Sequence, residues 1–130
     1  MNERMSSETN ALNWFEIPAI DISRAKKFYE SIFEIQMEEM ETPGMKYAMF
    51  PFDPMKAKIA GGLAKSPMHT PSATGSIIYL NANPDLQQVL ERVESAGGKI
   101  TMPKTSIGQN GFMAFFTDTE GNTMGLHSNT

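Results

Sequence analysis

The sequence predicts an α+β fold that is built from two tandem copies of one βαβββ unit. Residues 13–33 and 75–97 each read as a short strand, a turn and an amphipathic helix. The two segments lie about 62 positions apart, and a repeat at a fixed offset indicates a fold assembled from equal units. Ala60–Leu63 and Thr123–Leu126 close the two halves at nearly the same offset.

The composition limits the classes of protein to which this chain can belong. Its 130 residues suffice for one domain with a buried core. The net charge of −4 argues against a nucleic-acid-binding protein, and the absence of cysteine excludes disulfides and thiolate metal sites. Since no apolar run is long enough to span a bilayer and residues 1–10 lack an apolar signal core, we expect a cytoplasmic protein with no membrane partner.

The first half is predicted to begin after a flexible arm at residues 1–10. A strand at Trp14–Ile17 ends before Pro18, and Asp21 caps a helix over 22–33. Apolar residues recur at helical spacing and predict one buried stripe. Its members are Ile22, Ala25, Phe28, Tyr29, Ile32 and Phe33. A polar strand end and turn over 38–44, and strands at 46–52 and 57–64, complete module one, which spans residues 13–64.

The second half repeats this order within one domain, predicted over residues 11–130. A linker at 65–74, rich in proline and hydroxyl residues, leads into module two at 75–128. A strand at 76–80 precedes a helix that Asn83 caps and that ends at Gly97-Gly98. Its predicted buried stripe is Leu86, Val89, Leu90, Val93 and Ala96. The remaining predicted elements are strands at 99–102, 112–117 and 123–127, a loop at 103–110 and a tight turn at 118–122.

Two stretches of sequence carry a resemblance to a known family. The first is Phe15-Glu16-Ile17-Pro18 followed by Asp21 and the helical segment Ala25–Tyr29, and the second is Phe116–His127 with its Asp-x-x-Gly-Asn turn. In this order and repeated, they resemble the vicinal oxygen chelate superfamily. That superfamily includes glyoxalase I, bleomycin- and fosfomycin-resistance proteins and extradiol dioxygenases. The resemblance covers roughly residues 13–128, and a shared fold does not by itself define a reaction.

The resemblance implies a partly open β-sheet cup with the helices on its convex side. In metal-dependent members, His or Glu side chains from four strands hold a divalent ion in this cup. The corresponding positions fall at Trp14, Gly62, Ser76 and Gly125. Divalent ions need imidazole or carboxylate donors, so these residues predict a member without metal or other cofactor. A divalent metal stays the alternative, including an unusual set of Glu16, His69 and His127.

Strand alternation then selects the residues that line the cup. If Trp14 faces inward, Glu16 does too; if Ser76 faces inward, so does Ile78, while Ile77 and Tyr79 face the helix layer. Thr123 and His127 share the inner face with Gly125, and Phe112 closes the rim. The predicted ligand-binding residues are therefore Trp14, Glu16, Ser76, Ile78, Phe112, Thr123 and His127.

Glu16 is the candidate catalytic residue. A carboxylate in an apolar cup has a raised pKa and can act as a general base; the alternative is a structural hydrogen bond or ion pair. Trp14 either stacks on a flat ligand or fills the cup. His127 either faces the ligand or lies exposed at the end of its strand.

These observations predict a metal-free protein that binds a small molecule in its cup. The alternatives are a metal-dependent lyase or dioxygenase, a metal-independent enzyme with Glu16 as base, and a non-catalytic partner protein. By analogy with the resembling proteins, we expect a homodimer. The sequence does not name the ligand.

Overall fold

The computed structural model describes residues 4–56 and 59–130, and it confirms two tandem βαβββ modules. The elements of module one are β1 (Trp14–Pro18), α1 (Ile22–Phe33), β2 (Glu38–Thr42), β3 (Met45–Met49) and β4 (Ala60–Lys65). The elements of module two are β5 (Tyr79–Asn81), α2 (Leu86–Leu90), β6 (Lys99–Ser106), the 3-10 turn η1 (Gly108–Asn110), β7 (Phe112–Thr117) and β8 (Thr123–Ser128). The predicted arm includes residues 1–3, which lie outside the described residues; residues 4–10 form no helix or strand.

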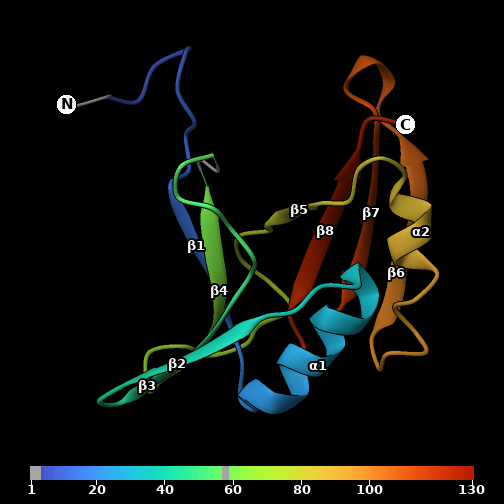
Figure 1. Ribbon diagram of the computed structural model, residues 1–130. Helices are drawn as coiled ribbons and strands as arrows, with labels where there is room; N and C mark the ends of the chain where they lie inside the picture. The colour runs from blue at the N-terminus through green and yellow to red at the C-terminus, as the bar shows by residue number, and fades with distance from the viewer. Residues whose placement is uncertain (1–3, 57–58) are drawn as a thin grey trace.

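The two modules share one strand topology. Each forms a four-stranded mixed sheet, in the order β1-β4-β3-β2 and β5-β8-β7-β6. In each sheet the first strand of the module pairs in parallel with its last strand, and the other pairs are antiparallel. Figure 1 shows the two sheets standing apart, with β5 at the edge of the second sheet that faces β1 and β4, and with α2 alongside β6. The sheets do not close into a barrel.

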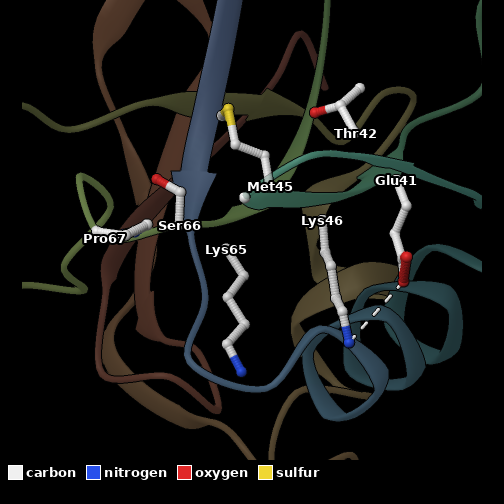
Figure 2. Close-up of a pocket in the computed structure, with 8 residues that line it drawn as sticks. Glu41, Thr42, Met45, Lys46, Lys65, Ser66 and Pro67 are labelled. Carbon is white, nitrogen blue, oxygen red and sulfur yellow. Dashed lines mark ion pairs between the residues drawn. The ribbon is translucent and has the colours of Figure 1, made fainter.

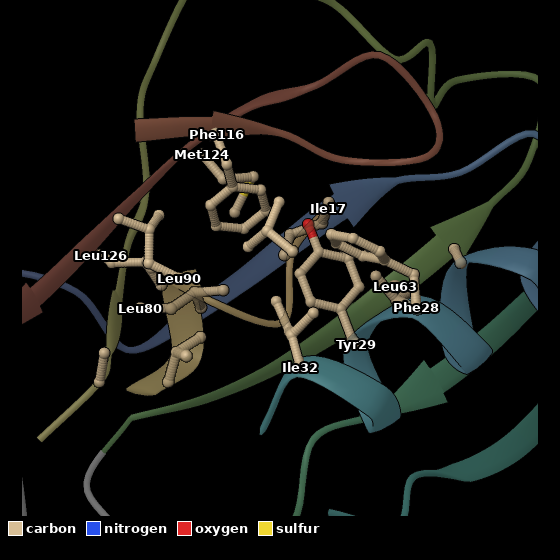
Figure 3. Packing of buried hydrophobic residues seen from close by; sticks show 14 of the residues in the cluster. Ile17, Phe28, Tyr29, Ile32, Leu63, Leu80, Leu90, Phe116, Met124 and Leu126 are labelled. Atoms are coloured by element: carbon tan, nitrogen blue, oxygen red, sulfur yellow. The ribbon is translucent and has the colours of Figure 1, made fainter. Parts of the chain in front are cut away.

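Helix α1 forms as its sequence predicts. The side chain of Asp21 accepts a hydrogen bond from the backbone N–H of Arg24 at 3.0 Å and caps the helix. The helix ends at Glu34, which adopts a left-handed conformation with φ of 56°. The predicted stripe is buried except at Phe33, which is half-buried. Figure 3 shows Phe28 and Tyr29 packing toward Phe116 of module two, so the stripe joins the two halves.

Helix α2 differs from its prediction at both ends. The cap is Asp85, whose side chain accepts from the N–H of Gln87, and the regular helix ends at Leu90. The predicted cap was wrong because Asn83 has another partner: its side-chain oxygen accepts from the N–H of Asn129 at 2.7 Å. A series of turns continues to Gly97, so the predicted apolar positions still face the core, although Ala96 is only half-buried.

Four strand boundaries also differ. Strand β3 ends at Met49, whereas the predicted strand ran to residue 52. Strand β5 begins at Tyr79 rather than Ser76. Strand β4 covers Ala60–Lys65; the predicted strand ran from residue 57 to 64, and its first two residues lie outside the described part of the chain. Strand β6 continues to Ser106 through a segment predicted to be a loop. Its pairing with β7 contains two register shifts between Ile100 and Thr105. Bulges of this kind tolerate a proline in a strand.

The linker at 65–74 is tied to both modules. The N–H of Ser72 donates to the side chain of Asn122 at 3.0 Å, and the hydroxyl of Thr123 donates to the carbonyl of Ala73 at 2.8 Å. At the other end, His69 contacts Glu16 of β1. The linker therefore runs along the gap between β1 and β8.

The tight turn after β7 holds the modules together through polar contacts. Asp118 accepts hydrogen bonds from the Tyr29 hydroxyl of α1 at 2.7 Å and from backbone and side-chain N–H groups of Asn122. Glu120 accepts from the backbone N–H groups of Ile20 and Asp21.

No helix among residues 4–56 and 59–130 is long and apolar enough to cross a membrane.

Gly61 is required where β4 passes β1. A Cβ atom at this position would lie 2.4 Å from the carbonyl oxygen of Phe15, which is backbone and cannot turn away. We expect Gly61→Ala to lower the free energy of unfolding by about 1 to 3 kcal/mol, measured by urea denaturation. The neighbouring Ala60→Gly is the control, with an expected loss below about 1 kcal/mol. Equal losses in the two variants would contradict this account.

Candidate functional site

Four side chains form a hydrogen-bonded chain centred on Glu16. One carboxylate oxygen of Glu16 lies 2.6 Å from Nε2 of His69, and the other accepts from the indole N–H of Trp14 at 3.1 Å. Nδ1 of His69 lies 2.6 Å from the hydroxyl of Ser66. Since Glu16 accepts only, Nε2 of His69 donates to it, and a neutral imidazole then accepts from Ser66 at Nδ1.

These contacts decide the acidity of Glu16. The hydrogen bond from His69 lowers the pKa of Glu16 most, burial raises it by less, and the indole of Trp14 and the charge on His69 lower it further. The net pKa lies below the ordinary value, so the predicted raised pKa was wrong. The sequence concealed the cause because His69 lies in the linker, 53 positions away from Glu16.

Glu16 lies on the wall of a cavity of about 240 Å³ between the two modules. Its apolar lining comes from Ile17 and Pro18 of β1, Met124 of β8, and Ile78. Its other polar lining residues are Thr70, Ser72, Thr74, Ser76, Asn122 and Thr123. The structure therefore brings four of the predicted ligand-binding residues to one cavity, namely Glu16, Ser76, Ile78 and Thr123.

The other three predicted ligand-binding residues lie elsewhere. Trp14 is 42% exposed and does not line this cavity. His127 lines a separate hollow beside η1, where its Nε2 lies 2.6 Å from the carbonyl oxygen of Asn110. Phe112 lies beneath the ammonium group of Lys104, 4.4 Å from the ring centroid. The structure therefore places four of the seven predicted residues at this cavity and three elsewhere, and the ligand-binding role of all seven stays a prediction.

The alternation predicted for the start of module two was wrong. The Tyr79 ring lies on the face of Gly125, since a Cβ atom added to Gly125 would come within 2.6 Å of it, and Ile78 packs against the core. Tyr79 is paired with Gly125 in β8 as Glu16 is paired with Gly62 in β4. Tyr79 is therefore the counterpart of Glu16. Sequence reasoning missed this pair, because it matched Trp14 with Ser76; the offset of 63 positions that separates Gly62 from Gly125 also separates Glu16 from Tyr79 and is the signal that would have found it.

The side chains present do not form a metal site of the expected kind. The four equivalent positions on the paired strands are Glu16, Gly62, Tyr79 and Gly125, which together offer one carboxylate. Within the described part of the chain, no three His, Asp or Glu side chains are grouped to hold an ion. His69 does contact Glu16, but His127 is bonded to Asn110 beside η1.

A third hollow, of about 480 Å³, lies between the β2–β3 hairpin and the linker. Figure 2 shows Lys46 and Lys65 projecting along it, with an ion pair of 3.9 Å between Lys46 and Glu41. Ser66 lies on its wall. The chain from Ser66 through His69 to Glu16 therefore runs from this hollow to the cavity between the modules.

Comparison with known proteins agrees with the fold. The chain is 30% identical to the putative glyoxylase CFP32 of Mycobacterium tuberculosis over 128 residues, which are 97% of this chain and 48% of that protein. The chain thus spans about half the length of this relative. Glyoxalase I from Zea mays superposes with a TM-score of 0.67 at 20% identity, over 90% of this chain and 45% of that one. TnmS3, an antibiotic-binding protein from Streptomyces sp. CB03234, superposes with a TM-score of 0.65 at 19% identity, over 96% and 100%.

The family model that matches the chain covers both modules. The match runs over residues 11–126, from before β1 into β8. The chain therefore belongs to the Glyoxalase/Bleomycin resistance protein/Dioxygenase superfamily.

Proposed function

We propose that this protein binds a small organic molecule, without a metal ion, in the cavity between its modules. The observation that carries the proposal is the lining of that cavity. Side chains from β1, the linker and β8 meet there, and they combine apolar walls with hydroxyl groups and one carboxylate. Ligand sites in proteins have this composition, with a few polar groups that orient a largely apolar ligand.

The size of the cavity limits the ligand. A volume of about 240 Å³ is below the usual range of about 300 to 1,000 Å³ for ligand pockets. We therefore expect a compact ligand, or one part of a larger molecule whose remainder extends past the linker. TnmS3 has the same fold and binds an antibiotic, which supports a binding role for this fold without naming the ligand here.

The chemistry of the site favours binding over the two catalytic alternatives. A metal-dependent lyase or dioxygenase would need further imidazole or carboxylate donors beside Glu16. A metal-independent enzyme with Glu16 as base would need a more basic carboxylate, whereas His69 and Trp14 lower the pKa of Glu16. The homodimer and the cytoplasmic location stay predictions; light scattering of the purified protein measures the first.

The binding role is tested by screening small fragments against the purified protein. Binding is read from the melting temperature and from the fluorescence of Trp14, the single tryptophan of the chain. We expect Ser76→Phe, which places a ring at the cavity wall, to abolish binding of a fragment that the native protein holds. His127→Gln is the matched control, because His127 lies in another hollow, and it should leave binding unchanged.

The metal-free part of the proposal has its own measurement. We expect no stoichiometric metal in the purified protein and no saturable change in melting temperature with Ni, Zn, Mn, Fe or Co. Bound metal, or a shift that Glu16→Gln removes, would overturn this part and favour a metal-dependent enzyme. Equal binding by the native protein and Ser76→Phe would instead overturn the assignment of the cavity.

A further inference from the structure

We infer that the cavity between the modules selects small ligands that carry a protonated amine and rejects anions. The inference rests on the proposed binding role and names the class of ligand. It starts from the charges that the described residues place around the cavity. Among the described residues, Glu16 is the one ionisable side chain on the cavity wall, and no lysine, arginine or histidine of that part of the chain lines it.

A second carboxylate lies directly behind the wall. Asn122 lines the cavity, and both its backbone N–H and its side-chain amide donate to Asp118, at 2.9 and 3.0 Å. Asp118 is buried, and its hydrogen bonds in the described structure come from neutral donors only: Tyr29, Asn122 and the backbone N–H of Glu120. Within residues 4–56 and 59–130, no ion pair to this carboxylate is formed. In contrast, Arg24 balances the nearby charge of Glu120.

The acceptor atoms of the wall suit an ammonium group. The carboxylate of Glu16 uses one oxygen toward His69 and the other toward Trp14, and its side chain stays 30% exposed. A carboxylate offers about four acceptor positions, so about two stay available to a ligand. The hydroxyl groups of Thr70 and Ser76 also lie on the wall, and both residues are exposed. An ammonium group has three N–H donors for such acceptors.

One basic side chain near the cavity contacts its carboxylate. His69 lies outside the cavity lining but its Nε2 lies 2.6 Å from Glu16, so a ligand shares this carboxylate with His69. The measurement is made at about pH 8, where an alkyl amine is still charged. Lys65 and Lys46 face the hollow between the β2–β3 hairpin and the linker and do not line the cavity.

The probes are benzylamine, benzyl alcohol and benzoate, which share a ring and differ in charge. Their binding to the native protein is measured by calorimetry at low salt. We expect benzylamine to bind at least about tenfold more tightly than benzyl alcohol, and benzoate not to bind. Glu16→Gln should bring the amine to the affinity of the alcohol. The control Glu41→Gln removes a carboxylate from the hollow between the β2–β3 hairpin and the linker, and it should keep the native preference.

The outcomes separate the two proposals. If benzyl alcohol binds and benzylamine binds no better, or if benzoate binds best, the charge preference is wrong while the binding role stands. If none of these three probes binds, and no fragment of the wider screen binds either, the binding role itself fails. Because the preference is measured first on the native protein, a variant that fails to fold does not remove the test.

Discussion

Asp118→Ala is expected to lower the free energy of unfolding by about 3 to 5 kcal/mol, because the substitution leaves several buried donors without a partner. The Asp118 side chain accepts from the hydroxyl of Tyr29, from the backbone N–H of Glu120 and from two N–H groups of Asn122. Tyr29 is fully buried, and burial followed by the charge of Asp118 raises the pKa of Tyr29 well above its ordinary value. Urea denaturation of the native protein and the variant measures the loss.

Two further variants divide this loss between the contacts of Asp118. Tyr29→Phe removes only the hydroxyl that donates to Asp118, and we expect a cost of about 1 to 2 kcal/mol. Asp53→Ala is the control, since Asp53 is exposed and its side chain accepts from the N–H of Met55 in a turn; the substitution should cost less than about 1 kcal/mol. A loss in Asp118→Ala no larger than in Asp53→Ala would show that the turn does not join the modules.

Glu120→Gln is the second substitution with a large expected effect, about 2 to 4 kcal/mol. The Glu120 side chain is fully buried; it accepts from Ile20 and Asp21 and forms a two-pronged pair with Arg24 at 2.7 and 3.0 Å. Burial raises the pKa of Glu120, but the bonds from Arg24, from the two backbone N–H groups and from Thr119 outweigh it and lower the pKa to about 2.

This shift predicts how stability depends on pH. The carboxyl of Glu120 has a pKa of 4.5 in its ordinary state and about 2 in the folded protein, so the unfolded chain binds the proton first. Its contribution is complete above about pH 4.5 and is lost as the pH falls toward about 2. We expect about 1 to 3 kcal/mol from this source, allowing for the half-exposed Arg24 partner.

The measurement is urea denaturation between about pH 2 and pH 6. Glu120→Gln should lose less stability than the native protein over this interval, because its amide does not titrate. Glu38→Gln is the control, since Glu38 is exposed and should leave the native slope unchanged. An unchanged slope in Glu120→Gln would contradict the lowered pKa and the role of the ion pair.

Sequence patterns correctly predicted the elements that depend on contacts between residues close together in the chain. Helix α1 begins and ends as predicted, because its cap and its buried stripe depend on residues within the helix. Strand β8 likewise alternates as predicted, with Met124 and Leu126 buried and Thr123 and His127 on the other face. In β5 the same logic failed, because the strand is only three residues long and its face is decided by the ring of Tyr79 over Gly125.

The candidate site shows the same division. The cavity residues Glu16 and Thr123 were predicted from the alternation of β1 and β8. The contact from His69 to Glu16 was not predicted, since it depends on the path of the linker, and it reverses the expected direction of the pKa shift.

By itself, the sequence determined two repeated modules, the stripe of α1 and the faces of β1 and β8, because periodic burial is a local property of a chain. Only the tertiary structure decided that His69 reaches Glu16, that Tyr79 covers Gly125, and that Asp118 and Glu120 bind residues of module one. These contacts join residues about 50 to 100 positions apart, and whether such residues meet depends on how the strands, the linker and the modules pack rather than on any local preference.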